Sequence, residues 1–177
     1  GWSPLLLALL GGDSNLPTVR LLIQHKACLE HTPSSRKGQT ALLLASANRQ
    51  EACVRELVTS GASLSVADRD GKRPLIHCAS WHPDAKAKRA CKLLIESLAD
   101  VTVRDSRGQL AAYTAALESG NAQTAQMLRD EAQRIQERAQ LELLGVASEI
   151  ASTATSEGGN SGPPGGKKSK KKSKGRS

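Results

Sequence analysis

The residues that could perform chemistry in this chain are its four cysteines and four histidines. A zinc site would need ligand pairs at spacings such as C-x-x-C or H-x-x-x-H, and the sequence contains neither. His77 and Cys78 are neighbours, but consecutive side chains on a helix point about 100° apart, so they cannot act as base and nucleophile. The sequence also lacks a G-x-S-x-G motif, a P-loop and a G-x-G-x-x-G motif. We therefore predict a protein that is not an enzyme and that binds no metal and no cofactor.

Three of the cysteines have the spacing of core residues. Cys53 and Cys91 fall at apolar positions of helical segments, and Cys78 falls at a small-residue position, where a cysteine behaves as a small hydrophobe. Four cysteines in 177 residues are too few for a disulfide scaffold. The cysteine content therefore predicts a reduced protein in the cytoplasm, the nucleus or both.

The remaining side chains that could take part in binding form a basic run near the C-terminus. Residues 167–176 contain six lysines and one arginine with no acid, a charge of +7 out of the +8 of the whole chain. Such a run is typical of a nuclear import signal, a nonspecific contact to nucleic-acid phosphates, an attraction to an anionic membrane or a solubilising tail. It has no interleaved aromatic residue and no neighbouring amphipathic or lipidation signal, so base-specific reading and stable membrane insertion are not expected. The lysines are Lys167, Lys168, Lys170, Lys171, Lys172 and Lys174.

An internal repeat in residues 1–121 predicts the fold that positions the candidate residues. Similar apolar segments begin at Ser3, Thr40, Arg73 and Leu110, at spacings of 37, 33 and 37 residues. Each of the first three is followed by a second apolar helical segment and a small-residue ending. The pattern predicts units of a turn, a short helix, a tight loop and a second helix, and such units must stack because none can bury its apolar face alone. Aromatic residues are 2% of the chain, so leucine and alanine must build the core.

These units resemble the ankyrin repeat family, over about two thirds of the chain. The family signature T-P-L-H-x-A-A fits best in the second unit, where residues 38–45 read Gly-Gln-Thr-Ala-Leu-Leu-Leu-Ala and the unit ends on Gly61 and Ala62. Arg73 and Leu110 replace the threonine whose hydroxyl normally fixes the helix start. The resemblance implies an all-α repeat solenoid of about four helix-turn-helix repeats that binds a protein partner. Because the first unit begins inside its hairpin, we expect a C-terminal fragment of a longer ankyrin-repeat protein.

Candidate partner-binding residues lie where the units are irregular or charged. The third unit carries an insertion that contains Trp81 and His82, and a tryptophan in such a loop either packs the helices or is presented to a partner. By resemblance, ankyrin proteins often bind with their hairpin tips and inner helices. The tips carry Arg69, Lys72, Arg104 and Arg107.

Residues 122–150 predict one long helix after the repeats. Apolar residues recur at spacings of three and four, and this stripe indicates either a capping helix that packs on the stack or a short coiled coil with weak self-association. Residues 151–177 are rich in Gly, Ser and Pro and predict a disordered linker that ends in the basic tail.

Two functions remain open. The first is a protein-binding scaffold or adaptor, with the tail used for nuclear import or electrostatic tethering. The alternative is a nucleic-acid- or ribonucleoprotein-associated factor, in which the lysine tail contacts phosphates and the repeats select a protein.

Overall fold

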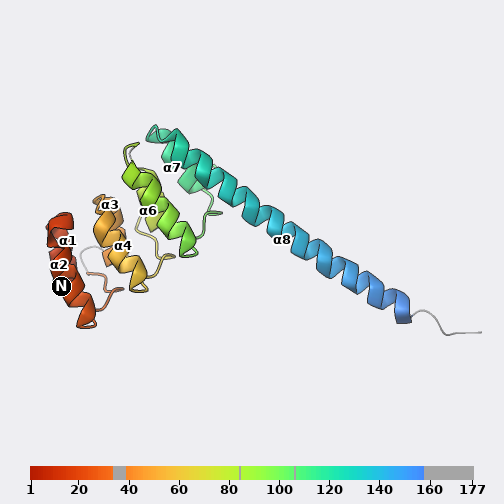
Figure 1. The fold of residues 1–177 in the computed structure, drawn as a ribbon, viewed down its shortest axis with the longest axis horizontal. Coiled ribbons are helices and arrows are strands. Elements are labelled where there is room, and N and C mark those ends of the chain that lie inside the picture. The colour runs from red at the N-terminus through yellow and green to blue at the C-terminus, as the bar shows by residue number, and fades with distance from the viewer. Residues whose placement is uncertain (34–38, 84, 106, 158–177) are drawn as a thin grey trace, which may run out of the picture. The chain divides into compact units, whose positions relative to one another are not determined.

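The computed structural model describes residues 1–33, 39–83, 85–105 and 107–157, and it shows four consecutive helix pairs (Figure 1). In chain order the helices are α1 (Pro4–Leu10), the 3-10 helix η1 (Gly12–Asn15), α2 (Leu16–Gln24), α3 (Ala41–Ala47), α4 (Glu51–Thr59), α5 (Pro74–Ala79), α6 (Ala85–Glu96), α7 (Ala111–Glu118) and α8 (Ala122–Glu157). Residues 1–135 form one compact unit. The predicted all-α repeat solenoid is confirmed.

The helices of the compact unit pack in two rows. The inner row contains α1, α3, α5 and α7 in sequence, each in contact with the next, and the outer row contains α2, α4 and α6. Alanines at one position of the inner helices, such as Ala45 and Ala79, are completely buried and allow the helices to approach closely. Leu43, Leu57 and Leu75 are at most 3% exposed, which confirms that leucines fill the space between stacked units.

Side-chain caps at the inner helices follow the sequence of each unit. The Ser3 hydroxyl accepts a hydrogen bond from the Leu6 amide at 3.3 Å, and the Thr40 hydroxyl accepts one from the Leu43 amide at 3.4 Å. Arg73 and Leu110 occupy the same position without a capping side chain, as their residue types predict. The helix start at Arg73 is instead favoured by Pro74, whose missing amide hydrogen is not needed in the first turn.

The 3-10 helix η1 of the first unit caps a helix of the second unit. Within η1, the Asp13 carboxylate accepts a hydrogen bond from the Cys53 amide of α4 at 3.2 Å. Gln50 precedes α4 but provides no side-chain cap of its own. Asp13 therefore satisfies an amide at the start of α4 from the neighbouring repeat.

The long helix α8 starts on the stack and ends later than predicted. Ala125, Leu128 and Ala132 are buried in the core of the compact unit, as the capping interpretation requires. The described residues from 136 to 157 belong to a second unit, in which Leu143 is 71% exposed. The helix continues to Glu157 rather than residue 150, because no Gly or Pro follows Gly145 until Gly158. The lysine run lies outside the described residues.

A candidate binding groove between two hairpins

The hairpins that precede α5 and α7 are built around equivalent aspartates. One oxygen of Asp68 accepts hydrogen bonds from the amides of Asp70 and Lys72, both at 2.9 Å. One oxygen of Asp105, 37 residues later, accepts them from the amides of Arg107 and Gln109, at 2.8 and 2.9 Å. A carboxylate that binds two amides of its own turn fixes the conformation of that turn. Neither aspartate is among the partner-binding candidates that the sequence suggested.

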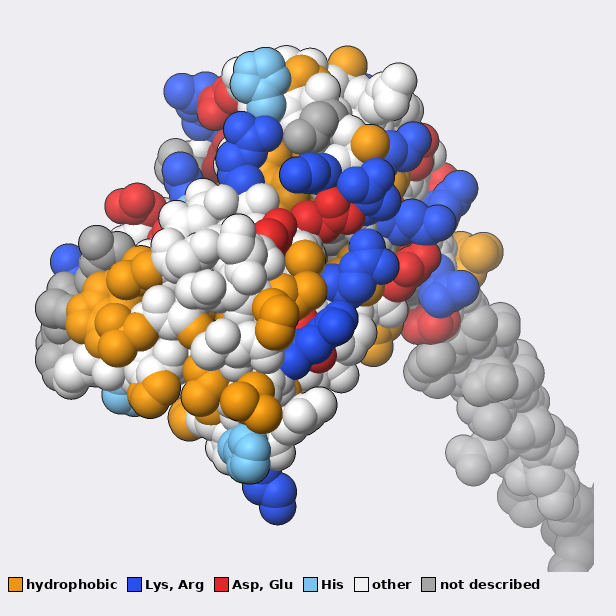
Figure 2. Space-filling model, turned by 60° about the vertical axis from the view of Figure 1, so that its left-hand side comes forward, with side chains coloured by type: hydrophobic (Ala, Val, Ile, Leu, Met, Phe, Trp, Pro, Cys, Tyr) orange, Lys and Arg blue, Asp and Glu red, His pale blue; other side chains and the backbone are white. Residues whose placement is uncertain are grey.

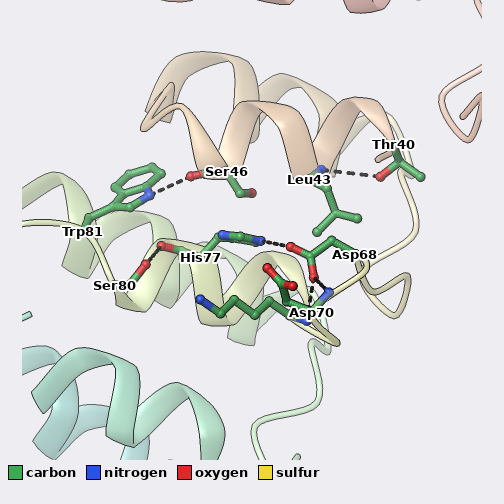
Figure 3. A network of polar contacts seen from close by, with 9 residues as sticks. Thr40, Leu43, Ser46, Asp68, Asp70, His77, Ser80 and Trp81 are labelled. Carbon is green, nitrogen blue, oxygen red and sulfur yellow. Dashed lines mark hydrogen bonds and ion pairs between the residues drawn. The ribbon is translucent and has the colours of Figure 1, made fainter. Parts of the chain in front are cut away.

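The second oxygen of each aspartate faces the inner helix behind its hairpin, and Figure 3 shows this contact for Asp68 and His77. Asp68 pairs with the His77 Nε2 atom at 2.7 Å, whereas Asp105 lies 3.4 Å from the Thr114 hydroxyl, which is also 3.0 Å from the Ala111 carbonyl of its own helix and has one proton to donate. The pKa of the Asp68 carboxyl lies below its ordinary value: burial raises this pKa, but the hydrogen bonds from the Lys72 amide and the His77 ring outweigh burial. The pKa of Asp105 is lowered as well, chiefly by the bond from the Gln109 amide.

An open groove of about 720 Å³ lies between these two hairpins. Small and apolar side chains of α5 and α7 line its floor, and the hairpin residues line its wall. The floor includes Ile76, Ser80, Ala111, Thr114, Ala115 and Ser119, and the wall includes Asp70, Lys72, Arg104, Asp105 and Arg107. The groove therefore has a small-residue floor on two neighbouring inner helices and a charged edge.

Three of the six predicted partner-binding residues meet at this groove. Lys72, Arg104 and Arg107 line it, and Arg104 also donates a hydrogen bond to the Gly108 carbonyl at 2.6 Å within its own hairpin. Arg69 is exposed on the hairpin that precedes α5 but does not line the groove. His82 is exposed in the insertion loop and does not line it either.

Trp81 lies in the core, which corrects its assignment as a partner-binding residue. Its side chain is 3% exposed, and its Nε1–H group donates a hydrogen bond to the Ser46 carbonyl of α3 at 2.7 Å (Figure 3). A side chain buried to this extent has almost no surface to offer a partner. Of the two interpretations that the sequence left open, the structure supports packing.

Equivalent carbonyls at the three junctions between repeats receive different donors. Leu9, Ser46 and Ala79 each lie six residues after the start of their unit. The Leu9 carbonyl accepts from the Gln50 side chain at 2.6 Å, and the Ala79 carbonyl accepts from the Ser119 hydroxyl at 3.2 Å. Trp81 thus performs for the second junction what Gln50 performs for the first. Gln50 and Trp81 lie at different distances from the start of their units, so spacing along the sequence does not reveal this equivalence.

The buried cysteines have environments that suppress nucleophilicity. Burial raises the pKa of the Cys53 and Cys78 thiols to about 12, and it raises the pKa of Cys91 well above its ordinary value. A thiol with such a pKa is almost entirely protonated at neutral pH and is a poor nucleophile and metal ligand. In the described residues, no three His, Cys, Asp or Glu side chains are grouped so that they could hold a metal ion.

Charged side chains on the outer helices are mostly paired with one another. Arg20 of α2 pairs with Glu56 of α4 at 2.8 Å, and Arg89 of α6 pairs with Glu51 of α4 through two hydrogen bonds of 2.7 and 2.9 Å. Figure 2 shows such a band of alternating basic and acidic side chains, with hydrophobic side chains gathered at the end of the stack that carries α1 and α2. The exposed hydrophobic residues there include Leu7, Leu10 and Leu21.

Stacked helix pairs, with hairpins before α5 and α7, define a helical-repeat solenoid. Residues 1–68 match the family model described as ankyrin repeats (3 copies). This match supports an ankyrin-repeat assignment for residues 1–68, and the structure continues the pattern of stacked helix pairs after residue 68. No curated protein matches the chain.

Ankyrin repeats generally mediate protein–protein interaction, and proteins built from them are typically non-enzymatic. Within the described part of the chain, no helix has both the length and the apolar character needed to cross a membrane.

Proposed function

We propose that the protein is an interaction scaffold or adaptor that binds a protein partner in the groove between the third and fourth repeats. The observation that carries this proposal is the groove itself, an open volume of about 720 Å³ walled by two hairpins that Asp68 and Asp105 hold in defined conformations. A wall with a fixed conformation loses little entropy when a partner binds, which favours affinity. The coarse function, protein–protein interaction, is the one that ankyrin repeats generally have.

A steric block of the groove tests this proposal. Ser80 is exposed, ends α5 and lines the groove, so Ser80→Trp should fill part of the groove without disturbing the core. Ala47 occupies the same position one repeat earlier, is exposed and does not line the groove, so Ala47→Trp is the matched control. Partners captured by the tagged wild-type protein and by the control should be lost from Ser80→Trp. Capture that is equal for all three proteins would contradict the proposal.

For the tail we propose an electrostatic role, as a nuclear import signal or as a tether to nucleic-acid phosphates. Its support is compositional: seven cations and no acid in residues 167–176. Replacing the six lysines by glutamine should reduce nuclear accumulation and flatten the salt dependence of nucleic-acid binding, while capture through the groove persists. If partner capture disappears with the lysines and survives Ser80→Trp, the alternative of a nucleic-acid-associated factor is favoured.

A further inference from the structure

The cations of the groove differ from those of the outer helices in their partners. On the outer helices, Arg20, Arg89 and Lys92 each pair with a glutamate. In the groove, no carboxylate of the described residues lies within ion-pair distance of Lys72, Arg104 or Arg107. Several cations of the outer helices are thus paired with a carboxylate, whereas the three cations of the groove are not.

The acids that line the groove make no ion pair with its cations. One oxygen of Asp105 accepts hydrogen bonds from two amides of its own hairpin, and the other lies 3.4 Å from the Thr114 hydroxyl of α7. The amide donors stabilise this carboxylate and lower its pKa. The lining carries three cations and the three acids Asp70, Asp105 and Glu118, and because no ion pair joins them among the described residues, each cation is open to a carboxylate of a ligand.

We propose that this groove binds a peptide segment of a partner through its Asp or Glu side chains, which pair with Lys72, Arg104 and Arg107. This inference rests on the proposed function and specifies the chemistry of the partner. The three cations are spread over two hairpins, so they suit several singly charged carboxylates along an extended segment. Asp70 and Glu118 would repel the higher charge density of a phosphate, and no aromatic side chain lines the groove to stack on a nucleobase.

Selection from a random peptide library displayed on phage tests the inference with the full chain. The test variant is Lys72→Gln with Arg107→Gln; Arg104 is kept because its bond to the Gly108 carbonyl belongs to the hairpin. The matched control is Lys86→Gln with Lys92→Gln on the exposed face of α6, which removes the same charge. A third variant replaces the six tail lysines by glutamine, because the tail itself attracts acidic peptides.

We expect peptides selected on the wild-type protein, the control and the tail variant to be enriched in Asp and Glu. Synthetic versions should bind the Lys72/Arg107 variant at least about tenfold more weakly, as the loss of hydrogen bonds to charged groups predicts. Their Glu→Gln counterparts should bind the wild-type protein with a similar loss. The inference is overturned if the peptides are not acidic, if their binding depends only on the tail, or if phosphoserine in place of Glu strengthens binding.

Ser80→Trp separates this inference from the proposed function. If Ser80→Trp removes peptide binding while the Lys72/Arg107 variant does not, the groove is a binding site but does not select acidic segments. If neither change affects binding, the proposed function itself fails.

Discussion

Two neighbouring junctions of the stack, α3 with α5 and α5 with α7, supply different hydrogen-bond donors to equivalent carbonyls. At the first of these, the buried Trp81 ring gives its Nε1–H group to the Ser46 carbonyl at 2.7 Å, and Arg89 reaches back to Glu51. At the second, the Ser119 hydroxyl lies 3.2 Å from the Ala79 carbonyl and also 3.0 Å from the Ala116 carbonyl of its own helix. A hydroxyl has one proton and cannot donate fully to both. The groove therefore lies at the junction that has the weaker hydrogen bond between its two repeats.

The largest expected effect comes from breaking the stronger junction. Trp81→Ala should lower the free energy of unfolding by about 3–5 kcal/mol, because it leaves a cavity between two repeats. Trp81→Phe keeps most of the ring but leaves the Ser46 carbonyl without its donor, so it should cost about 1–3 kcal/mol. Urea unfolding followed by circular dichroism measures both. Equal stabilities of wild type and Trp81→Ala would mean that the insertion loop does not pack as described.

Loss of the hydrogen bond between Asp68 and His77 should have an intermediate and pH-dependent effect on the free energy of unfolding. Asp68→Asn removes a charge that stabilises three hydrogen bonds, which should cost about 1–2 kcal/mol near neutral pH. Since the folded pKa of Asp68 is depressed, its contribution is complete above the unfolded pKa of about 3.9 and disappears as the pH falls through the lower folded value. Unfolding curves of the two proteins, measured from pH 7 downward, should converge at acid pH. A difference in the free energy of unfolding that stays constant across that pH range would contradict a stabilising role of the Asp68 charge.

Loss of the hydrogen bond at the junction between α5 and α7 should lower the free energy of unfolding by less. Ser119→Ala removes the shared hydroxyl and should lower the free energy of unfolding by no more than about 1 kcal/mol. The comparison with Trp81→Phe is the informative quantity, because both changes remove one donor from an equivalent carbonyl. If Ser119→Ala were the more damaging of the two, the order of the junctions would be reversed.

The smallest effect on stability is expected in the exposed part of α8. Leu143 and Leu144 are 71% and 61% exposed, so changing both to serine should alter the free energy of unfolding by about 0.5 kcal/mol or less per residue. The same double variant tests self-association through this helix: sedimentation velocity at rising concentration should show association of the wild type and its loss in the variant. A wild-type protein that stays monomeric at every concentration would contradict a coiled-coil role.

The sequence predicted the helices and much of the core because these depend on local periodicity and on a repeat spacing that can be read directly. The prediction that leucines build the core is confirmed for this reason, for example at Leu43, Leu57 and Leu75. The environment of Trp81 could not be predicted, since it depends on a carbonyl 35 residues away that the insertion happens to reach. The groove was only partly predictable: Lys72, Arg104 and Arg107 were recognised at hairpin tips, but their lack of carboxylate partners is a property of the assembled stack.

The cap that Asp13 places on α4 has a consequence for how the stack assembles. The Cys53 amide and the Gln50 side chain both find their acceptors in the first repeat, so α4 reaches its full stability only after α1 and η1 have formed. In a solenoid whose units stabilise one another pairwise, such shared bonds raise the coupling between neighbours and make them unfold together. The first two repeats should thus behave as one cooperative block, and amide hydrogens of α4 should exchange at the same rate as those of α1.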